Sequence, residues 1–414
     1  MSKRNKYYPT KYYIRILTFL VFSFFVRYYR IRAKVPRPVK KLKPPYLLLS
    51  NHVGYWDPFL IGHFLPHFVH FVSSDAAFKT KIAGFFLPRL GVIPKRKNVR
   101  DTQVIRDIIQ VIGQGENVGI FPEAVRNWAG TTLPIDPSIA KLVRLLNVPV
   151  VVALSRGMNL FNPRWSKNVR KTKVEIEYGL LLDLEDLKNL SVEEIFKRIV
   201  SALQYDEVKA QLANKEVIYS KRKAEHINYA VYVCPECEAI GSFTVSENDF
   251  WCLNCDYHLS IDDYGFFRLS GTGFMHYSNI RDWYNWQEKW MFDYVENLYN
   301  ENSTEIIFVD RSSQIFHSAD NGKLLWIGRA DILLYLDRIE LIFLDREHTI
   351  TLDIGSLQTI NPQVNEKLEI FYRNETYRCV GAKPGVSGLK WEVAVNAIWK
   401  ITGQTTKLSP YIKQ

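Results

Sequence analysis

Short apolar runs alternate along the chain with stretches of helical periodicity. The runs are "YLLLS" (46–50), "LGVIPK" (90–95), "NVGIFP" (117–122) and "VPVVVALS" (148–155). Between them, "TQVIRDIIQVIGQ" and "PSIAKLVRLLN" carry apolar residues at helical spacing. Runs of this length that are apolar throughout are typical of strands buried on both faces. The alternation therefore predicts an α/β domain with a mostly parallel sheet flanked by helices.

A different pattern follows in the last third of the chain. Short strand-like runs succeed one another: "TEIIFVD", "DILLYL", "RIELIFL", "HTITLDI", "KLEIFYR" and "ETYRCVG". The helical pattern "LKWEVAVNAIWKI" (389–401) ends the series. This order predicts a β-rich domain closed by a C-terminal helix. It resembles the pleckstrin-homology-like architecture at the level of element order.

The positive charge of the chain is concentrated at its N-terminus. The formal net charge is +11, from 54 basic and 43 acidic residues among 414. Residues 1–50 hold thirteen Lys and Arg and no Asp or Glu, which leaves 41 basic against 43 acidic residues elsewhere. The excess therefore indicates one anionic partner that is met by one segment.

The same segment is aromatic and apolar, with paired tyrosines around "ILTFLVFSFFV" (16–26). As a helix this run spans about 17 Å, short of the hydrocarbon core of about 30 Å. We therefore expect residues 1–45 to lie on an anionic membrane surface and to end in a Pro- and Lys-rich linker. A signal peptide does not fit, because charged residues follow the run. Nucleic acid is not expected, and the alternative is a first helix packed on the protein's own core.

A histidine and a carboxylate follow the first apolar run, in "LLLSNHVGYWDPFLIG" (47–62). A neutral imidazole accepts a proton near pH 7, and a carboxylate beside it fixes one tautomer. Such a pair can serve as the base for a hydroxyl that attacks an acyl carbon. His52 and Asp57 can meet if the backbone turns into a helix between them, with Gly54 easing the turn. Taken alone, the pair is better explained as a core histidine beside a helix-capping aspartate.

Polar residues also end other predicted strands. "GVIPKRK" (91–97) ends in three consecutive cations, and "FPEAVRN" (121–127) contains an acid and an arginine. Parallel sheets bind ligands at strand ends, and an arginine there suits a phosphate. Together, "NHVGYWD", "GVIPKR", "FPEAVR" and "VPVVVALSRG" resemble, in order, the four blocks of the glycerol-phosphate and lysophosphatidate acyltransferases, across about residues 46–160.

The resemblance implies roles for individual residues. His52 would be the general base and Asp57 its orienting partner, while Arg96, Glu123 and Arg126 would bind the phosphorylated acceptor. The implied reaction moves a fatty acyl group from a thioester donor, acyl-CoA or acyl carrier protein, to the hydroxyl of a lysophosphatidate-like glycerolipid. It also implies a membrane-associated enzyme, which agrees with the character of the N-terminus.

This sequence departs from the family pattern in the third block. Ala124 stands where the family usually has glycine, and Val125 where it usually has threonine. A Cβ at position 124 narrows the close approach of backbone to ligand that glycine allows. The departures leave the chemistry unchanged but weaken the identification of lysophosphatidate itself as the acceptor.

Four cysteines form two Cys-x-x-Cys pairs, "CPEC" (Cys234, Cys237) and "CLNC" (Cys252, Cys255). Two such pairs separated by 14 residues are typical of a tetrahedral structural zinc site. The alternatives are two disulfides or four unligated core thiols. We predict one zinc ion held in a zinc ribbon, and thus a reducing compartment on the cytoplasmic face of a membrane. Cys379 stands alone in a strand pattern and is expected to be a core thiol.

A stripe of aromatic residues follows the cysteines. Trp283, Trp286, Trp290 and Tyr294 recur at helical spacing within residues 280–298. The stripe indicates core packing between the ribbon and the β-rich domain, with a second membrane contact as the alternative.

These patterns divide the chain into four parts. We expect a membrane-surface segment and linker at 1–45, an acyltransferase domain at 46–225, a zinc ribbon at 226–268 and a β-rich domain at 269–414. The competing hypothesis is a catalytically inactive membrane adaptor that uses the ribbon and β-rich domain to bind a partner. Turnover that depends on His52 distinguishes the enzyme from the adaptor.

Overall fold

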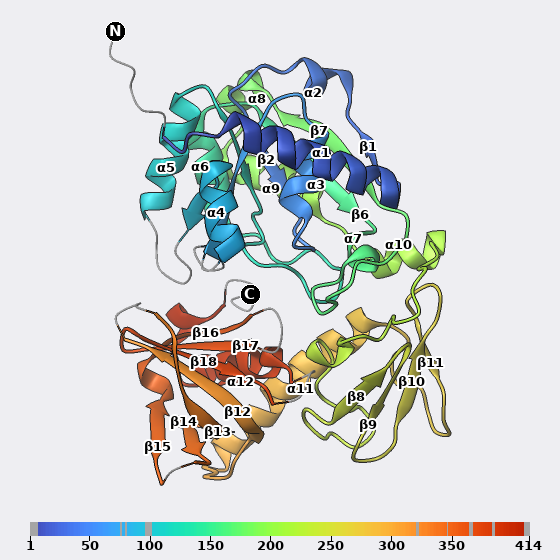
Figure 1. Cartoon of the computed structure of the whole chain (residues 1–414), viewed down its shortest axis with the longest axis vertical. Helices are drawn as coiled ribbons and strands as arrows, with labels where there is room; N and C mark the ends of the chain where they lie inside the picture. Colours follow the sequence, from blue (N-terminus) through green and yellow to red (C-terminus); the bar gives the residue numbers. More distant parts are fainter. Residues whose placement is uncertain are drawn as a thin grey trace. The chain divides into compact units, whose positions relative to one another are not determined.

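The computed structural model describes residues 7–74, 77–78, 81–95, 102–319, 323–345, 347–363, 367–382 and 386–409. The chain forms two compact units (Figure 1). The first consists of residues 1–163 and 171–216, and the second of residues 164–170 and 217–414.

A seven-stranded sheet with the order β1-β7-β6-β2-β5-β3-β4 forms the centre of the first unit. Neighbouring strands are parallel except for the antiparallel pair of β6 and β7. The strands are β1 (Arg32–Lys34), β2 (Leu47–Ser50), β3 (Val69–Ser74), β4 (Ile93–Lys95), β5 (Asn117–Ile120), β6 (Val150–Arg156) and β7 (Glu175–Leu182). The predicted mostly parallel sheet is confirmed.

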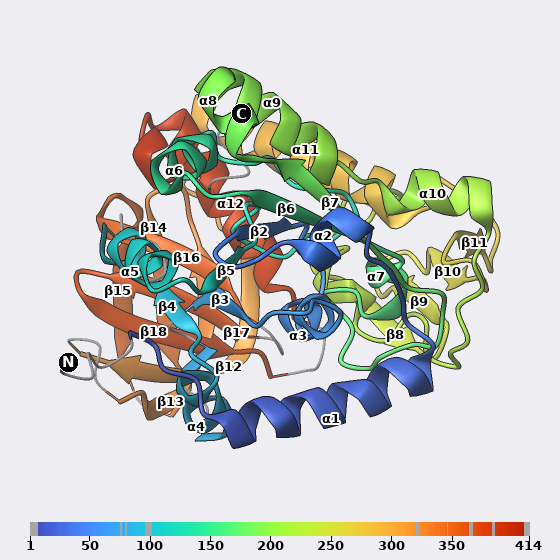
Figure 2. The same ribbon diagram turned by 90° about the horizontal axis from the view of Figure 1, so that it is seen from above.

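Helices flank both faces of this sheet, with α5, α6 and α9 on one face and α1 and α3 on the other (Figure 2). The helices are α1 (Tyr12–Tyr29), α2 (Arg37–Lys41), α3 (Asp57–His63), α4 (Lys81–Arg89), α5 (Thr102–Gly113), α6 (Ser138–Leu146), α7 (Met158–Phe161), α8 (Leu184–Asn189), α9 (Val192–Leu203) and α10 (Glu207–Asn214).

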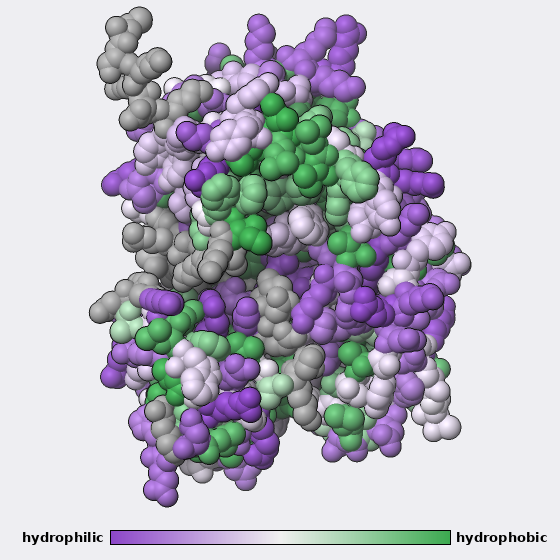
Figure 3. Space-filling view, in the orientation of Figure 1, coloured by the Kyte–Doolittle hydropathy of each residue, from purple (hydrophilic) through white to green (hydrophobic). Residues whose placement is uncertain are grey.

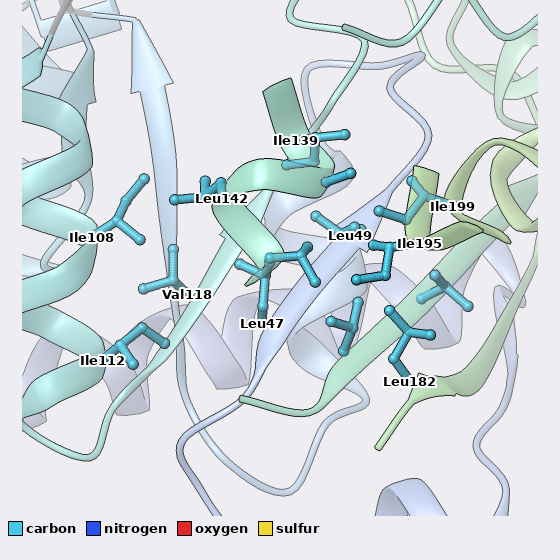
Figure 4. Packing of buried hydrophobic residues seen from close by; sticks show 14 of the residues in the cluster. Leu47, Leu49, Ile108, Ile112, Val118, Ile139, Leu142, Leu182, Ile195 and Ile199 are labelled. Atoms are coloured by element: carbon cyan, nitrogen blue, oxygen red, sulfur yellow. The ribbon is translucent and has the colours of Figure 1, made fainter. Parts of the chain in front are cut away.

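The core between the sheet and helices α5, α6 and α9 explains why the central strands are rich in apolar residues. Leu47 and Leu49, on alternate positions of β2, belong to one buried cluster with Ile108 of α5, Leu142 of α6 and Ile195 of α9 (Figure 4). All four residues of β2 are buried, which is the expected environment of a central parallel strand.

Residues 1–45 are part of the first unit, which differs from the expected separate segment and linker. β1 pairs in parallel with β7, and α2 occupies much of the expected linker. One face of α1 is buried on α3, where Phe22 stacks on Phe59 with ring centroids 4.8 Å apart. The short, charged β1 has no apolar pattern of its own, since it lies at the edge of the sheet.

The second unit contains two antiparallel sheets. The four-stranded sheet has the order β11-β10-β9-β8, and the seven-stranded sheet has the order β15-β14-β13-β12-β18-β17-β16. The smaller sheet consists of β8 (Phe243–Ser246), β9 (Asp249–Cys252), β10 (His258–Ile261) and β11 (Phe267–Leu269). The larger consists of β12 (Phe308–Ser318), β13 (Leu325–Leu334), β14 (Arg338–Phe343), β15 (Thr349–Asp353), β16 (Leu357–Pro362), β17 (Lys367–Tyr372) and β18 (Glu375–Val380).

Two long helices complete the second unit, α11 (Ile280–Asn300) and α12 (Gly388–Ile401). α12 is the predicted C-terminal helix, and eleven of its residues are buried. Trp283 of α11 is fully buried, contacts Phe250 and Phe267 of the small sheet, and donates to the carbonyl of Val233 at 3.0 Å. This part of the aromatic stripe therefore packs in the core, and Cys379 is likewise buried.

Candidate functional site

The candidate active site begins where β2 ends. Asn51 follows the strand and is tied to the neighbouring strand β6. Its Oδ1 accepts the backbone N–H of Ser155 at 2.8 Å, and its Nδ2 donates to the carbonyl of the same residue at 3.0 Å. The backbone that leads into His52 is therefore held in register with the sheet.

The structure brings His52 and Asp57 together. The His52 Nδ1 lies 2.9 Å from the Asp57 Oδ2, which also accepts the backbone N–H groups of Val53 at 2.7 Å and Gly54 at 2.9 Å. The Asp57 side chain is fully buried and that of His52 is 19% exposed. When the Asp57 carboxylate accepts a hydrogen bond from Nδ1–H, Nε2 is left as the basic nitrogen of the imidazole.

Gly54 is required for close packing rather than for an unusual backbone conformation. A Cβ at this position would lie 3.2 Å from the Asp57 Oδ1 and 3.3 Å from the Met158 Cε. A larger residue in the turn between His52 and Asp57 would therefore require these neighbours to shift by a few tenths of an ångström.

Glu123 supports the His52 backbone in this structure. Its two carboxyl oxygens accept the N–H groups of His52 and Leu133, each at 2.7 Å, and the residue is 1% exposed. Burial raises the pKa of Glu123 to about 8, although these two backbone hydrogen bonds favour the ionised form. Both oxygens thus accept hydrogen bonds from the protein itself, and the expected role of Glu123 in binding the acceptor stays a prediction.

Ala124 adopts the left-handed backbone conformation, with φ of +61°. This conformation costs a residue with a Cβ roughly 1 kcal/mol more than glycine. The left-handed conformation therefore explains why glycine is usual at this position of the family's block. Alanine is tolerated here at some cost in stability.

Of the two arginines expected to bind phosphate, the structure describes one. Arg126 is half-buried in the loop that follows β5. Arg96 lies outside the described residues, directly after β4. Their role in binding an acceptor phosphate stays a prediction.

Two neighbours of His52 were missed by the sequence analysis. The ring of Phe121 stacks on the imidazole, with centroids 4.1 Å apart and planes at 21°. The side chain of Asn127 donates to the His52 carbonyl at 3.2 Å. Phe121 begins the third block and Asn127 directly follows it. No pattern in a single sequence shows that these two side chains contact His52.

The four cysteines of the two Cys-x-x-Cys pairs form one cluster, and their Sγ atoms all lie within 4.8 Å of one another. The Cys234–Cys255 and Cys237–Cys252 distances are both 3.7 Å. Four thiolates at Zn–S distances of about 2.3 Å in a tetrahedron are about 3.8 Å apart, so the cluster has the size of a zinc site. All four are free thiols rather than disulfides.

The outer face of α1 is a large exposed apolar surface (Figure 3), which we call the α1 face. No helix in the described part of the chain has both the length and the hydropathy of a membrane-spanning segment. Lys11 precedes the helix, Arg27 and Arg30 lie at its end, and all three are exposed. The exposed apolar residues of the α1 face are Tyr12, Tyr13, Ile16, Leu17, Phe19, Leu20, Val21, Phe24 and Tyr28.

Comparison with known proteins identifies the domain that carries His52. An acyltransferase family model matches residues 28–155. A 1-acyl-sn-glycerol-3-phosphate acyltransferase of Bacillus subtilis (strain 168) is 24% identical over 160 residues, which are 38% of this chain and 77% of that protein. The structure of PlsC, a 1-acyl-sn-glycerophosphate acyltransferase of Thermotoga maritima, is also similar. The match covers 46% of this chain and 78% of the PlsC chain, at 17% identity and a TM-score of 0.40. The match to the Vps36 N-terminal PH domain covers 25% of this chain and 84% of that domain's chain, at 21% identity and a TM-score of 0.20.

Residues 28–155 match the acyltransferase family model, so the chain carries an acyltransferase domain. It is an acyltransferase enzyme, and the matched range contains His52, Asp57, Glu123 and Arg126. The family expected from the four sequence blocks is confirmed. The pleckstrin-homology-like interpretation of residues 269–414 stays a prediction.

Proposed function

We propose that the enzyme transfers a fatty acyl group from a thioester donor, acyl-CoA or acyl carrier protein, to the hydroxyl of a lysophosphatidate-like glycerolipid, with His52 as general base. The observation that carries the proposal is the 2.9 Å contact between His52 Nδ1 and Asp57 Oδ2, because it makes Nε2 the basic nitrogen. The name of the similar Bacillus subtilis enzyme supports the choice of acceptor.

The proposed reaction is a direct transfer. The His52 Nε2 takes the proton of the acceptor hydroxyl while the hydroxyl oxygen attacks the thioester carbonyl. The tetrahedral oxyanion then collapses, the C–S bond breaks, and the imidazolium can return the proton to the leaving thiolate. Asp57 stabilises the imidazolium, since its Oδ2 contacts Nδ1 and its side chain is excluded from water.

Kinetics of a His52→Ala variant test this function. Turnover of lysophosphatidate, with acyl-CoA and acyl carrier protein donors tested in turn, should fall by at least about 10²-fold. His317→Ala is a matched control, because His317 also contacts a carboxylate, Glu375 at 3.2 Å, but lies in the second unit. The control should retain turnover. Full activity of His52→Ala would contradict the proposal, and a wild-type chain inactive on every lysolipid would favour the adaptor.

We further propose that the enzyme is attached to the cytoplasmic side of an anionic membrane through the α1 face. Exposed apolar and aromatic side chains on one side of a helix, with cations at its ends, are typical of helices that lie in the interface of a bilayer. Such attachment would bring a lipid acceptor to the unit that contains His52. A reducing compartment would keep the four cysteines of the cluster available as zinc ligands.

We also propose that Cys234, Cys237, Cys252 and Cys255 hold one structural zinc ion. The support is the 3.7 Å spacing of two Sγ pairs, which fits tetrahedral thiolate ligation. Four protein ligands would close the site, so its role would be to stabilise the fold. Asn254 supports the ligands, because its Nδ2 donates to the Cys237 Sγ at 3.3 Å.

A further inference from the structure

The peptide groups on both sides of the His52 Cα are held by one loop, residues 121–130. The N–H of His52 donates to the Glu123 Oε1 at 2.7 Å. Its carbonyl accepts two hydrogen bonds from Asn127, from the backbone N–H at 3.1 Å and from Nδ2 at 3.2 Å. A segment more than 70 residues away in the sequence therefore fixes the backbone of the proposed base.

The Asn127 side chain has a defined orientation within this loop. It is 2% exposed, and its Oδ1 accepts the backbone N–H of Gly130 at 3.0 Å. Reversing the amide would bring its oxygen against the His52 carbonyl and its nitrogen against the Gly130 N–H, so both hydrogen bonds would be lost. Gly130 has φ of +78°, the left-handed conformation that closes the turn.

The side chains of Asp57 and Phe121 contact the imidazole itself. Nδ1 meets Asp57, and the ring face meets Phe121, which belongs to the same loop as Asn127. Only two side-chain torsions separate the imidazole from the Cα of His52. A shift of this backbone is therefore passed directly to Nε2, the nitrogen that must reach the acceptor hydroxyl.

We infer that Asn127 is a positioning residue that sets the place of His52 Nε2 through the His52 carbonyl. The inference rests on the proposed role of His52 as base. Asn127 itself would touch neither substrate, so its loss should affect the chemical step more than binding. Misplacement of a catalytic group by about 1 Å costs as much as roughly 10²-fold in rate.

Asn117 provides a matched control for a purely structural effect. It lies in the same unit, in β5, and is 1% exposed. Its Oδ1 accepts the N–H of Tyr46 at 3.0 Å, and its Nδ2 donates to the carbonyl of Phe68 at 2.9 Å. Both asparagines therefore link distant backbone segments, but only Asn127 contacts His52.

The experiment compares Asn127→Ala with Asn117→Ala in full-length protein. We expect Asn127→Ala to lower kcat about tenfold or more while both KM values stay within about twofold. Asn117→Ala should lower the unfolding temperature but keep kcat within about twofold of wild type. Asn127→Ser keeps a short donor and should recover part of the rate. Nitrogen NMR of the His52 imidazole should change in Asn127→Ala alone.

The outcomes separate this inference from the proposed function. If kcat and the His52 NMR signals of Asn127→Ala match those of Asn117→Ala while His52→Ala is inactive, Asn127 has no positioning role and the proposed function stands. If His52→Ala remains active, the proposed function fails and the inference fails with it. If Asn127→Ala does not fold, the same comparison is made with Asn127→Ser, for which wild-type kcat would overturn the inference.

Discussion

Two glutamate substitutions on the α1 face test membrane attachment without disturbing the fold. Leu20 and Phe24 are 60% and 72% exposed, so the protein itself does not need them as core residues. Deleting residues 1–45 is less informative, because it would remove β1 from the sheet and uncover Phe59, on which Phe22 stacks. The double variant Leu20→Glu/Phe24→Glu changes the outer face alone.

The expected magnitude follows from the exposed fractions. Complete burial of a leucine or phenylalanine side chain is worth about 1.5–3 kcal/mol. Scaled by exposures of 60% and 72%, the two side chains would contribute about 2–4 kcal/mol when embedded in lipid. A loss of 2 kcal/mol lowers the membrane partition coefficient about 30-fold. Repulsion between two glutamates and an anionic surface adds to this loss.

Sedimentation with vesicles that contain anionic phospholipid measures the effect. The matched control is Leu145→Glu/Leu212→Glu, since these residues are each 61% exposed and lie on α6 and α10. Both double variants carry the same added charge, so general repulsion cancels in the comparison. Equal vesicle binding by the two variants would refute the α1 face as the membrane contact. Unfolding temperatures close to that of wild type should accompany either result.

Two further predictions concern stability. Metal analysis should find about one zinc per chain, and the Cys252→Ser variant should lose it. The variant should also lower the unfolding temperature of the whole second unit, because Trp283 joins α11 to the small sheet. A metal-free chain of unchanged stability would contradict this prediction. Burial raises the pKa of Glu207 from 4.5 to about 7. Between these pH values Glu207 stays protonated in the folded state but is ionised in the unfolded state. The free energy of unfolding should therefore fall as the pH rises from about 4.5 to 7, by up to about 3 kcal/mol. Glu207→Gln should reduce this fall in denaturation experiments at pH 5 and 8, and an unchanged pH dependence would show that Glu207 is not its source.

The sequence was sufficient for features that depend on local pattern. Apolar runs predicted the buried strands, since a strand covered on both faces needs apolar residues throughout, and β2 is buried at every position. The spacing of the cysteines predicted the cluster that the structure forms. The four blocks predicted the family, because their order and spacing carry more information than any single motif.

Tertiary structure decided which residues surround His52. Glu123 was expected to bind the acceptor, yet both of its oxygens accept backbone N–H groups of the protein itself. Asn127 was not singled out, although it holds the His52 carbonyl. The contacts of Glu123 and Asn127 with His52 join residues 71 and 75 positions apart. A local sequence pattern does not predict which distant backbone group a side chain will contact.

The N-terminal segment shows the same division between local pattern and tertiary context. Its composition determined that residues 1–45 are basic, aromatic and apolar, and hence suited to an anionic surface. Only the fold decided that Phe22 turns inward onto Phe59 while Leu20 and Phe24 turn outward. The physical reason is that a helix apolar around most of its circumference can bury any face, and the packing partner on α3 selects the one that is covered.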